Sequence, residues 1–515
     1  MQHPNGSFLC SPSSTAYALM QTKDENCFRY LAGIVQKFNG GVPHSYPMDL
    51  FEQLWVVDRL ERLGFSRFFK SEIKEILDYV YGCWTCNGIS WSKDTIEFDI
   101  DDTCMGFRMM RLHGYDVNAS AIQHFMRDGQ FFCFVGQNSQ GLTEMLSLYR
   151  ASQVLFPQES ILEEAKSFSS NFLRKKQELG EVADRWLITK DLAGEVKYYM
   201  DVPWYANLPR IETRHYIEQY GGDDDVWIAK TLYRMYNVST NDYLDLAKLD
   251  YNHCQKLHQS EWLGIQKWCE DYNLRDFNLY NDDLLKFYFV AMSSIFEPEK
   301  ATERIAWAKT AALVELVSKY FDETSVDQKK DFIQAFNYGA TNELVEVILK
   351  TLSDISLEVQ AVHGKEVYPD LKHAWNTWLM NLTIEGDNDL VPNNEAELLV
   401  STINLCAGHS SSDGLNSLPE YVSLTKLTNE ICNQLHQTEN FKVGKQNNCS
   451  DEKFDSIDLK MQELVQHTIK ISNDEVDKET KRTFLTVAKS YYYTAYCEPT
   501  TIDNHIAKVL FQEVV

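Results

Sequence analysis

The sequence predicts an all-α protein, and three observations support this fold class. Apolar residues recur at the i, i+3, i+4 spacing that buries one face of a helix. Strand-like alternation of apolar and polar residues is scarce. The first half of the chain also carries an approximate repeat, in which a glycine-containing turn with nearby aromatic residues leads into a helix.

The apolar faces predict a series of helices along the chain. In the first of them, Leu54, Val57 and Leu60 lie on one face, as one buried side of a helix requires. A polar stretch at residues 438–455 predicts an exposed loop. The predicted helical segments are residues 51–63, 73–80, 103–112, 143–155, 304–320, 342–352 and 483–495.

The repeat indicates how the first helices are arranged. Its turns contain Gly6, Gly40, Gly88 and Gly129, each followed by a helical segment. Units of roughly 35–50 residues with about two helices each are typical of a closed or curved array of helical hairpins. If the array closes, the inner helix ends surround one cavity.

A domain boundary is expected after residues 220–227, which contain two glycines and an acidic run. Long helices without the glycine–aromatic turn follow, so we assign residues 1–236 and 237–515 to two domains. The acidic run itself is interpreted as a solvated loop.

The composition bounds the function. The 515 residues suffice for two or three domains, and the hydrophobic fraction of 44% is that of a globular protein. The net charge of 49 − 75 = −26 argues against nucleic acid or an anionic membrane as the main partner. No apolar run of 18 residues indicates a membrane span.

The 12 cysteines are scattered, a pattern that suits a reducing compartment. Cys83 and Cys86 have C-x-x-C spacing, but no second such pair and no nearby pair of histidines completes a zinc site. We therefore interpret their spacing as chance. The first six residues are neither a signal peptide nor a transit peptide.

The strongest candidate for chemistry is the group Asp99, Asp101 and Asp102 at the turn that enters the segment 103–112. Carboxylates this close repel one another, and in a site shielded from water one of them is favoured as the neutral acid. Such an acid can protonate a group that is hard to protonate. The alternatives are an acidic loop or a helix N-terminus, where aspartate is favoured.

These aspartates lie in a pattern that resembles plant class II diterpene cyclases, the copalyl diphosphate synthases. The resemblance implies an α/α barrel-like β domain with the D-x-D-D motif, followed by an α-helical terpene synthase α domain. It also implies cyclisation of geranylgeranyl diphosphate by protonation of its terminal alkene. The matching segments are residues 98–103, 106–108, 111–115, 11–17, 131–137, 203–205, 220–222, 226–228, 230–235 and 508–512.

The resemblance assigns roles to individual residues. It makes Asp101 the general acid, with Asp99 and Asp102 supporting it through hydrogen bonds. Thr143 matches a residue that holds the catalytic aspartate, and Ser147 stands one helical turn later, where family members often have asparagine. Arg185 matches a lysine that contacts the diphosphate, and arginine can make that contact in a bidentate way.

His44 departs from the family pattern. It stands where ent-copalyl diphosphate synthases usually have an asparagine that helps to hold the water acting as terminal base. Because imidazole can itself act as a base near neutral pH, His44 predicts altered deprotonation or the opposite product stereochemistry. The alternative is a surface or structural histidine.

Aromatic side chains that stabilise carbocations are expected from the same resemblance. Trp91, Trp204 and Tyr205 are the candidates, with core packing as the alternative interpretation.

The second half departs from the metal motifs of class I terpene synthases. The aligned stretch is 318–322, where Ser318 and Lys319 replace two carboxylates, and the second motif reads Asn429, Glu430, Asn433 and Gln437. An ammonium does not gather Mg²⁺, so we assign no metal ligand in this chain. The resemblance implies Mg²⁺ through an acidic motif outside it.

The resemblance also implies a γ domain and a plastid transit peptide before the matched pattern, and both are missing from this chain. An open cavity admits water, so weak or no activity is expected of the chain alone. The alternatives are an inactive isoform or a helical prenyl-diphosphate-binding protein, and a cyclase that hydroxylates its product. Plastid localisation and functional coupling to a class I diterpene synthase are further expectations of the resemblance.

Overall fold

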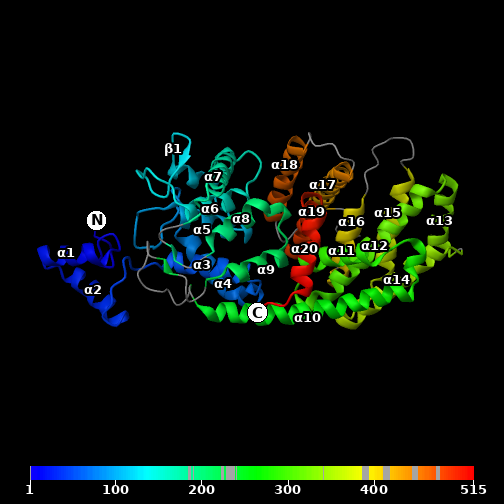
Figure 1. The fold of residues 1–515 in the computed structure, drawn as a ribbon, viewed down its shortest axis with the longest axis horizontal. Helices are drawn as coiled ribbons and strands as arrows, with labels where there is room; N and C mark the ends of the chain where they lie inside the picture. Colours follow the sequence, from blue (N-terminus) through cyan, green and yellow to red (C-terminus); the bar gives the residue numbers. More distant parts are fainter. Residues whose placement is uncertain are drawn as a thin grey trace. The chain divides into compact units, whose positions relative to one another are not determined.

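The chain divides into two compact units, called unit 1 and unit 2 below. Unit 1 comprises Met1–Trp204 and Thr213–Asp250, and unit 2 comprises Tyr205–Glu212 and Tyr251–Val515 (Figure 1). The predicted boundary at 236/237 lies outside the described residues and stays a prediction. The computed structural model describes residues 2–183, 187–188, 191–221, 226–227, 238, 240–339, 341–384, 394–409, 418–443, 450–470 and 476–515.

Unit 1 is built from helices, as predicted. Its strands are two antiparallel pairs: β1 (Met126–Arg127) with β2 (Gln130–Phe131), and β3 (Leu187–Ile188) with β4 (Val226–Trp227). Two helices, α9 (Pro209–Gln219) and α10 (Asn241–Asp271), contribute residues to both units. The helices wholly within unit 1 are α1 (Pro12–Thr22), α2 (Glu25–Lys37), α3 (Asp49–Arg62), α4 (Lys70–Gly82), α5 (Ile100–Leu112), α6 (Leu142–Ser152), α7 (Ser160–Glu178) and α8 (Leu192–Asp201), with the 3₁₀ turns η1 (Ser66–Phe69) and η2 (Ala119–Phe125).

Unit 2 is a bundle of longer helices. Neighbours along the chain pack together, for example α11 with α12 and α17 with α18, and the later helix α19 packs against both α16 and α17. Its elements are η5 (Leu274–Phe277), α11 (Asn281–Ser294), η6 (Pro298–Lys300), α12 (Ala301–Glu323), α13 (Val326–Tyr338), α14 (Glu343–His363), α15 (Tyr368–Ile384), α16 (Glu395–Cys406), α17 (Pro419–Val443), α18 (Ser450–Lys470), α19 (Lys478–Tyr496), α20 (Pro499–Ile506) and the π-helical turn η7 (Ala507–Phe511).

The predicted all-α class is confirmed, and each predicted helical segment overlaps a helix of the structure, although 143–155 runs three residues past the end of α6. One prediction was wrong. The stretch 438–455 is not a loop throughout, because α17 extends to Val443 and α18 begins at Ser450. Polarity alone does not separate a loop from a helix end, since Glu, Lys and Gln are good helix formers. The acidic run at 223–225 lies outside the described residues.

The repeat of glycine turns is confirmed by the backbone. Gly6, Gly40, Gly88 and Gly129 all have positive φ, between 72° and 93°, the conformation in which glycine is favoured. The four turns precede α1, α3, α5 and α6, respectively. The glycine–aromatic signal therefore marked real chain reversals ahead of the helices.

The helices of unit 1 close into an array, as the repeat predicts. Helix α5 packs against α3 and α6, and α7 packs against α6 and α8 (Figure 1). Arg62 of α3 then forms an ion pair of 2.6 Å with Glu195 of α8, and both side chains are buried. This buried pair joins α3 to α8.

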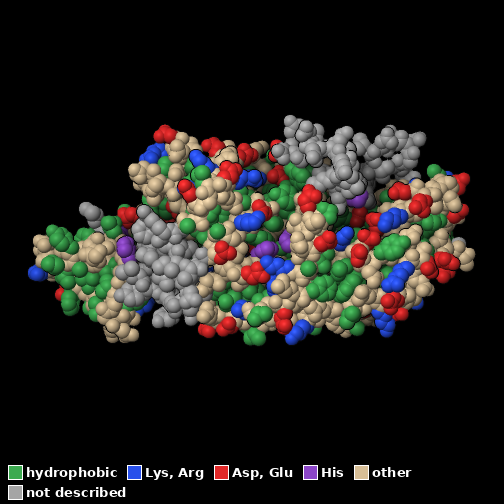
Figure 2. Space-filling view, viewed as in Figure 1, with side chains coloured by type: hydrophobic (Ala, Val, Ile, Leu, Met, Phe, Trp, Pro, Cys, Tyr) green, Lys and Arg blue, Asp and Glu red, His purple; other side chains and the backbone are tan. Residues whose placement is uncertain are grey.

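The surface carries both signs of charge. On the face drawn in Figure 2, Lys and Arg side chains are dispersed among Asp and Glu side chains. Across the ranges that the structure describes, no helix combines the length and the apolar character that a membrane crossing requires.

Candidate active site

The three aspartates singled out by the sequence lie at the first turn of α5. Asp99 is the N-cap residue, with an extended backbone, and its Oδ1 accepts a hydrogen bond of 2.8 Å from the backbone N–H of Asp102. Asp101 and Asp102 belong to the first helical turn, where the helix dipole favours negative charge. The helix N-terminus interpretation is therefore correct for the local geometry.

Burial distinguishes this N-terminus from an ordinary one. The exposed fractions of Asp99, Asp101 and Asp102 are 0%, 2% and 0%, so the exposed acidic loop is excluded. Burial, followed by the negative charges of Asp101 and Asp99, raises the pKa of the neighbouring Cys104 thiol well above its usual value. The turn is thus a dry, strongly negative environment in which a neutral acid is favoured over a further carboxylate.

Two backbone segments hold this turn in place. Ile100 donates from its N–H to the carbonyl of Cys133 at 3.0 Å, and Asp99 donates to the carbonyl of Ile89 at 3.3 Å. The Thr103 hydroxyl accepts from the N–H of Ile89 and donates to its carbonyl, each at 3.0 Å. The aspartates are therefore anchored to the segment after Gly88 and to the segment after β2.

Thr143 and Ser147 lie on α6, the helix packed against α5. They are one turn apart and therefore share a face, and both side chains are half-buried. The Thr143 hydroxyl is 3.3 Å from Oε2 of Glu144. The structure thus brings the helix of Thr143 and Ser147 beside the helix of the aspartates.

The other predicted polar residues, His44 and Arg185, do not lie on α5 or α6. His44 lies between α2 and α3 in the segment 41–48, and its side chain is exposed. The N–H of Tyr46 donates to the carbonyl of Cys10 at 2.8 Å, so this segment is attached to the turn that lies between Gly6 and α1. Arg185 lies outside the described residues.

The aromatic candidates separate into two groups. Trp91 is half-buried, and its carbonyl accepts from the N–H groups of Leu50 and Phe51, both at 3.1 Å, at the start of α3. Its ring meets Phe134 edge-on at 6.2 Å. Phe134 follows the Cys133 carbonyl that anchors α5, and the sequence reasoning did not single it out although it lies in a matched segment.

Trp204 and Tyr205 lie at the division between the units. Trp204 is half-buried in the short turn η3 (Trp204–Ala206). Tyr205 is buried in unit 2, where its ring packs at 5.6 Å from Tyr492. Core packing is the interpretation that the contacts of Tyr205 favour.

The class I metal positions in unit 2 do not fit a metal ion. Lys319 of α12 pairs with Glu315 one turn earlier at 3.0 Å. In the second motif, Asn429 accepts from the backbone N–H of Glu397 at 3.0 Å, and Glu430 is held by Lys460 at 2.7 Å. Mg²⁺ needs several oxygen ligands, whereas here a cation occupies position 319 and protein contacts engage Asn429 and Glu430.

Nowhere among the described residues do three or more His, Cys, Asp or Glu side chains gather in an arrangement able to hold a metal ion.

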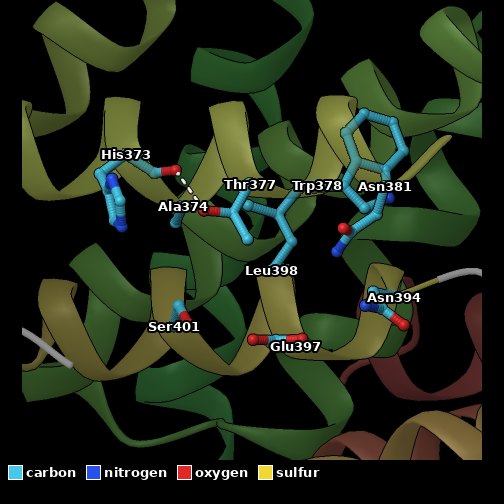
Figure 3. Close-up of a pocket in the computed structure, with 9 residues that line it drawn as sticks. All are labelled: His373, Ala374, Thr377, Trp378, Asn381, Asn394, Glu397, Leu398 and Ser401. Atoms are coloured by element: carbon cyan, nitrogen blue, oxygen red, sulfur yellow. Dashed lines mark hydrogen bonds between the residues drawn. The ribbon is translucent and has the colours of Figure 1, made fainter. Parts of the chain in front are cut away.

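A small pocket lies between α15 and α16 in unit 2 (Figure 3). Its volume of about 30 Å³ holds one or two water molecules. Burial raises the pKa of Glu397, which faces the pocket and receives a hydrogen bond from Asn429. The pocket is too small for a prenyl diphosphate. It is lined by His373, Ala374, Thr377, Trp378, Asn381, Asn394, Glu397, Leu398 and Ser401.

Two family models match the chain. Residues 1–200 match the terpene synthase N-terminal domain, and residues 270–388 match the metal binding domain of the terpene synthase family. The second match includes residues 318–322, where Lys319 stands in place of a metal ligand.

Known proteins resemble the whole chain. A chloroplastic (-)-kolavenyl diphosphate synthase of Tripterygium wilfordii is 51% identical over 541 residues, and a chloroplastic ent-copalyl diphosphate synthase of Salvia miltiorrhiza is 50% identical over 529. Both alignments cover all of this chain, which spans 66% and 65% of the length of these relatives.

A solved structure gives the same result. The crystal structure of ent-copalyl diphosphate synthase from Arabidopsis thaliana, in complex with (S)-15-aza-14,15-dihydrogeranylgeranyl thiolodiphosphate, is 44% identical to this chain. It superimposes with a TM-score of 0.91 and covers 100% of this chain and 73% of its own.

Proposed function

The chain belongs to the terpene synthase family, within its copalyl diphosphate synthase branch, and from this premise we propose that it is a class II diterpene cyclase. The substrate is geranylgeranyl diphosphate, and the product is a copalyl (labdadienyl) diphosphate. The observation that carries the proposal is the first turn of α5, where three aspartates are at most 2% exposed.

Asp101 is the acid in this proposal. Burial and the neighbouring carboxylates favour its neutral form, and a carboxylic acid kept neutral near pH 7 has a proton to give. Asp99 is fixed as the N-cap by the hydrogen bond that its side chain accepts from the backbone N–H of Asp102, so this supporting side chain is preorganised.

The reaction balances without a redox partner. The proton of the Asp101 carboxyl forms a new C–H bond with the terminal alkene, and the resulting cation closes two rings through the following alkenes. A base removes a proton from the final cation, and proton transfer through solvent returns Asp101 to its acid form. The diphosphate is retained, so the reaction is an isomerisation. Exclusion of water protects both the acid and the cations.

Thr143 and Ser147 are proposed as hydrogen-bonding partners of the acid. They are one turn apart and therefore share one face of α6, the helix that packs against α5. Arg185 is proposed to bind the diphosphate through its guanidinium fork, although it lies outside the described residues.

His44 is proposed to alter the final deprotonation. Its side chain is exposed, which also fits the alternative of a surface histidine, so the product of a variant decides between the two. The His44→Asn variant is expected to change the double-bond position, the hydroxylation or the chirality of the product, read by chiral gas chromatography. An unchanged product would remove His44 from the mechanism.

No step of this proposal runs through a metal. The resemblance implies Mg²⁺, which accompanies diphosphates in many enzymes, but the pairs Lys319–Glu315 and Lys460–Glu430 engage the class I positions of unit 2 that they involve. We further propose a plastid location, since both relatives are described as chloroplastic, and coupling to a class I diterpene synthase that consumes the product.

Product analysis tests the proposal. The 515-residue chain is incubated with geranylgeranyl diphosphate, with and without Mg²⁺, and organic extracts are analysed by mass spectrometry before and after phosphatase treatment. A bicyclic alcohol is expected only after phosphatase, because the diphosphate is retained. Asp101→Asn, which keeps the shape of the side chain, is expected to abolish it.

Asp116→Asn is the matched control, because Asp116 is an exposed carboxylate just beyond the end of α5. It is expected to behave like the parent chain. A hydrocarbon formed without phosphatase, or equal activity of Asp101→Asn, would each contradict the proposal. No product from the parent chain is the result expected where an open cavity admits water. A diol after phosphatase would instead identify a hydroxylating cyclase.

A further inference from the structure

A second group of charges lies in the interior of unit 1, on residues that the sequence reasoning did not consider. Asp58 of α3 is 2% exposed and contacts three buried arginines. Its carboxylate lies 2.7 Å from Arg150 of α6, 3.3 Å from Arg62 of α3 and 3.5 Å from Arg108 of α5. A single carboxylate thus connects three helices.

Two of these arginines have matching places on their helices. Arg108 follows Asp101 by 108 − 101 = 7 residues on α5, and Arg150 follows Thr143 by 150 − 143 = 7 residues on α6. Seven residues make about two turns, so each pair shares one face and is separated by about 10 Å along the helix axis. Asp58 therefore holds the face of α5 that carries the proposed acid and the face of α6 that carries Thr143.

The Asp58 carboxylate is held in its ionised form. Burial alone would raise the pKa of Asp58, but the charges of Arg150, Arg62 and Arg108 outweigh burial and hold that pKa well below its usual range. The junction itself is anchored, because Arg62 also pairs with Glu195 at 2.6 Å and stacks 3.6 Å from the ring of Tyr216. Asp58 is thus a fixed point to which α5 and α6 are tied.

We propose that Asp58 is a positioning residue, which sets the rotation and register of α5 against α6 and so holds Asp101 in the geometry for proton transfer. This inference rests on the proposed function of Asp101. Misplacement by about 1 Å far from the reacting atoms can lower a rate by about a hundredfold. Asp58 itself touches neither substrate nor reacting atoms in this proposal.

The test compares Asp58→Asn with a matched variant that also removes a carboxylate from a buried arginine of α5. Glu159→Gln breaks the pair that Glu159 makes with Arg111 of α5, at 2.6 Å for both of its oxygens, but this pair does not connect α5 to α6. Each variant also weakens a buried arginine–carboxylate contact. The melting temperatures of the two variants therefore show how much stability each one loses. Asp58→Glu restores the charge.

The expected result is a split between rate and binding. For Asp58→Asn we expect kcat to fall about a hundredfold with KM within about threefold, and Asp58→Glu to recover part of kcat. Glu159→Gln should lose melting temperature without a comparable loss of kcat. The proposal is overturned if the two charge-removing variants lose kcat in proportion to their melting temperatures.

A second readout is independent of activity. Cys104 is fully buried and lies one turn after Asp101, so its alkylation by iodoacetamide reports whether the start of α5 has loosened. Peptide mass spectrometry should show faster labelling of Cys104 in Asp58→Asn than in Glu159→Gln. Equal protection of Cys104 in both variants would contradict the inference.

These readouts separate the two proposals. If the parent chain forms no bicyclic product, kcat cannot be compared and Cys104 labelling alone decides whether Asp58 positions α5. Equal activity of the parent chain and Asp101→Asn would instead overturn the proposed function. If Asp58→Asn does not fold, Arg150→Lys takes its place, because lysine keeps the charge but loses the planar fork. It is expected to show the same changes at smaller size, and parent-like kcat and labelling would refute the role.

Discussion

Substitution of Gly88 by alanine tests whether the glycine turn before α5 positions the buried aspartates. Gly88 has φ +93°, a region that alanine rarely adopts. A Cβ added there would lie 2.3 Å from Oγ1 and 2.5 Å from Cγ2 of Thr103. Thr103 is fully buried, short and branched, so it cannot move aside without losing its two hydrogen bonds to Ile89.

The magnitude follows from these two effects. The left-handed conformation costs alanine about 1–2 kcal/mol. Displacement of Thr103 leaves buried backbone groups of Ile89 without their partner, which costs about 1–3 kcal/mol. The expected loss is therefore about 3–4 kcal/mol of unfolding free energy, or about 10 °C in melting temperature.

A double-mutant cycle identifies the contact. Thr103→Ala alone should cost about 2 kcal/mol through the same lost hydrogen bonds. In the double variant this loss counts once, so we expect about 3–4 kcal/mol rather than the sum of about 5–6. Gly33→Ala is the control, since Gly33 lies within α2 and its added Cβ meets no atom within 4 Å. It should gain about 0.5–1 kcal/mol.

Urea unfolding followed by circular dichroism measures all four variants. Additive losses for Gly88→Ala and Thr103→Ala, or a Gly88→Ala chain as stable as its parent, would refute the reasoning. Cyclase activity should fall with Gly88→Ala, because the displaced segment anchors the first turn of α5.

Three further predictions follow from buried groups. Burial lowers the pKa of His258 to about 2, so its neutral form stabilises the fold above pH 6.5, and this contribution is lost as pH falls. Between pH 7 and pH 5 the loss is about 2 kcal/mol, measurable by urea unfolding, and His258→Gln should flatten the dependence. Exposed Cys86 should react with iodoacetamide in the native protein while Cys104 does not, as peptide mapping would show. Arg111→Lys should cost about 2 kcal/mol in urea unfolding, because lysine loses the bidentate pair with Glu159, and an unchanged midpoint would refute this.

Local features of unit 1 could be predicted from the sequence because they depend on neighbours in the chain. The apolar spacing of residues 51–63 marked α3, and the four glycines marked the turns before the helices. A helix N-terminus was one interpretation of the three aspartates because aspartate is favoured there, and the structure makes Asp99 the N-cap. The burial of the three aspartates was a hypothesis that only the packed array confirms.

Contacts between distant residues were beyond sequence reasoning. Nothing near Asp58 in the sequence indicates that Arg108 and Arg150, 50 and 92 residues away, meet its carboxylate. Tyr205 follows Trp204 directly, yet the two belong to different units. Such contacts depend on how helices pack against one another, and the residue spacing along a single helix does not determine that packing.

The paired lysines of unit 2 constrain how this chain can change in evolution. A return to metal binding requires carboxylates at 318 and 319, but Lys319→Asp alone would set two like charges one turn apart, because Glu315 would lose its partner. Use of Glu430 as a metal ligand would likewise take from Lys460 its partner carboxylate. Each single step is unfavourable until the others are made, so drift by single substitutions is expected to keep unit 2 in its present state.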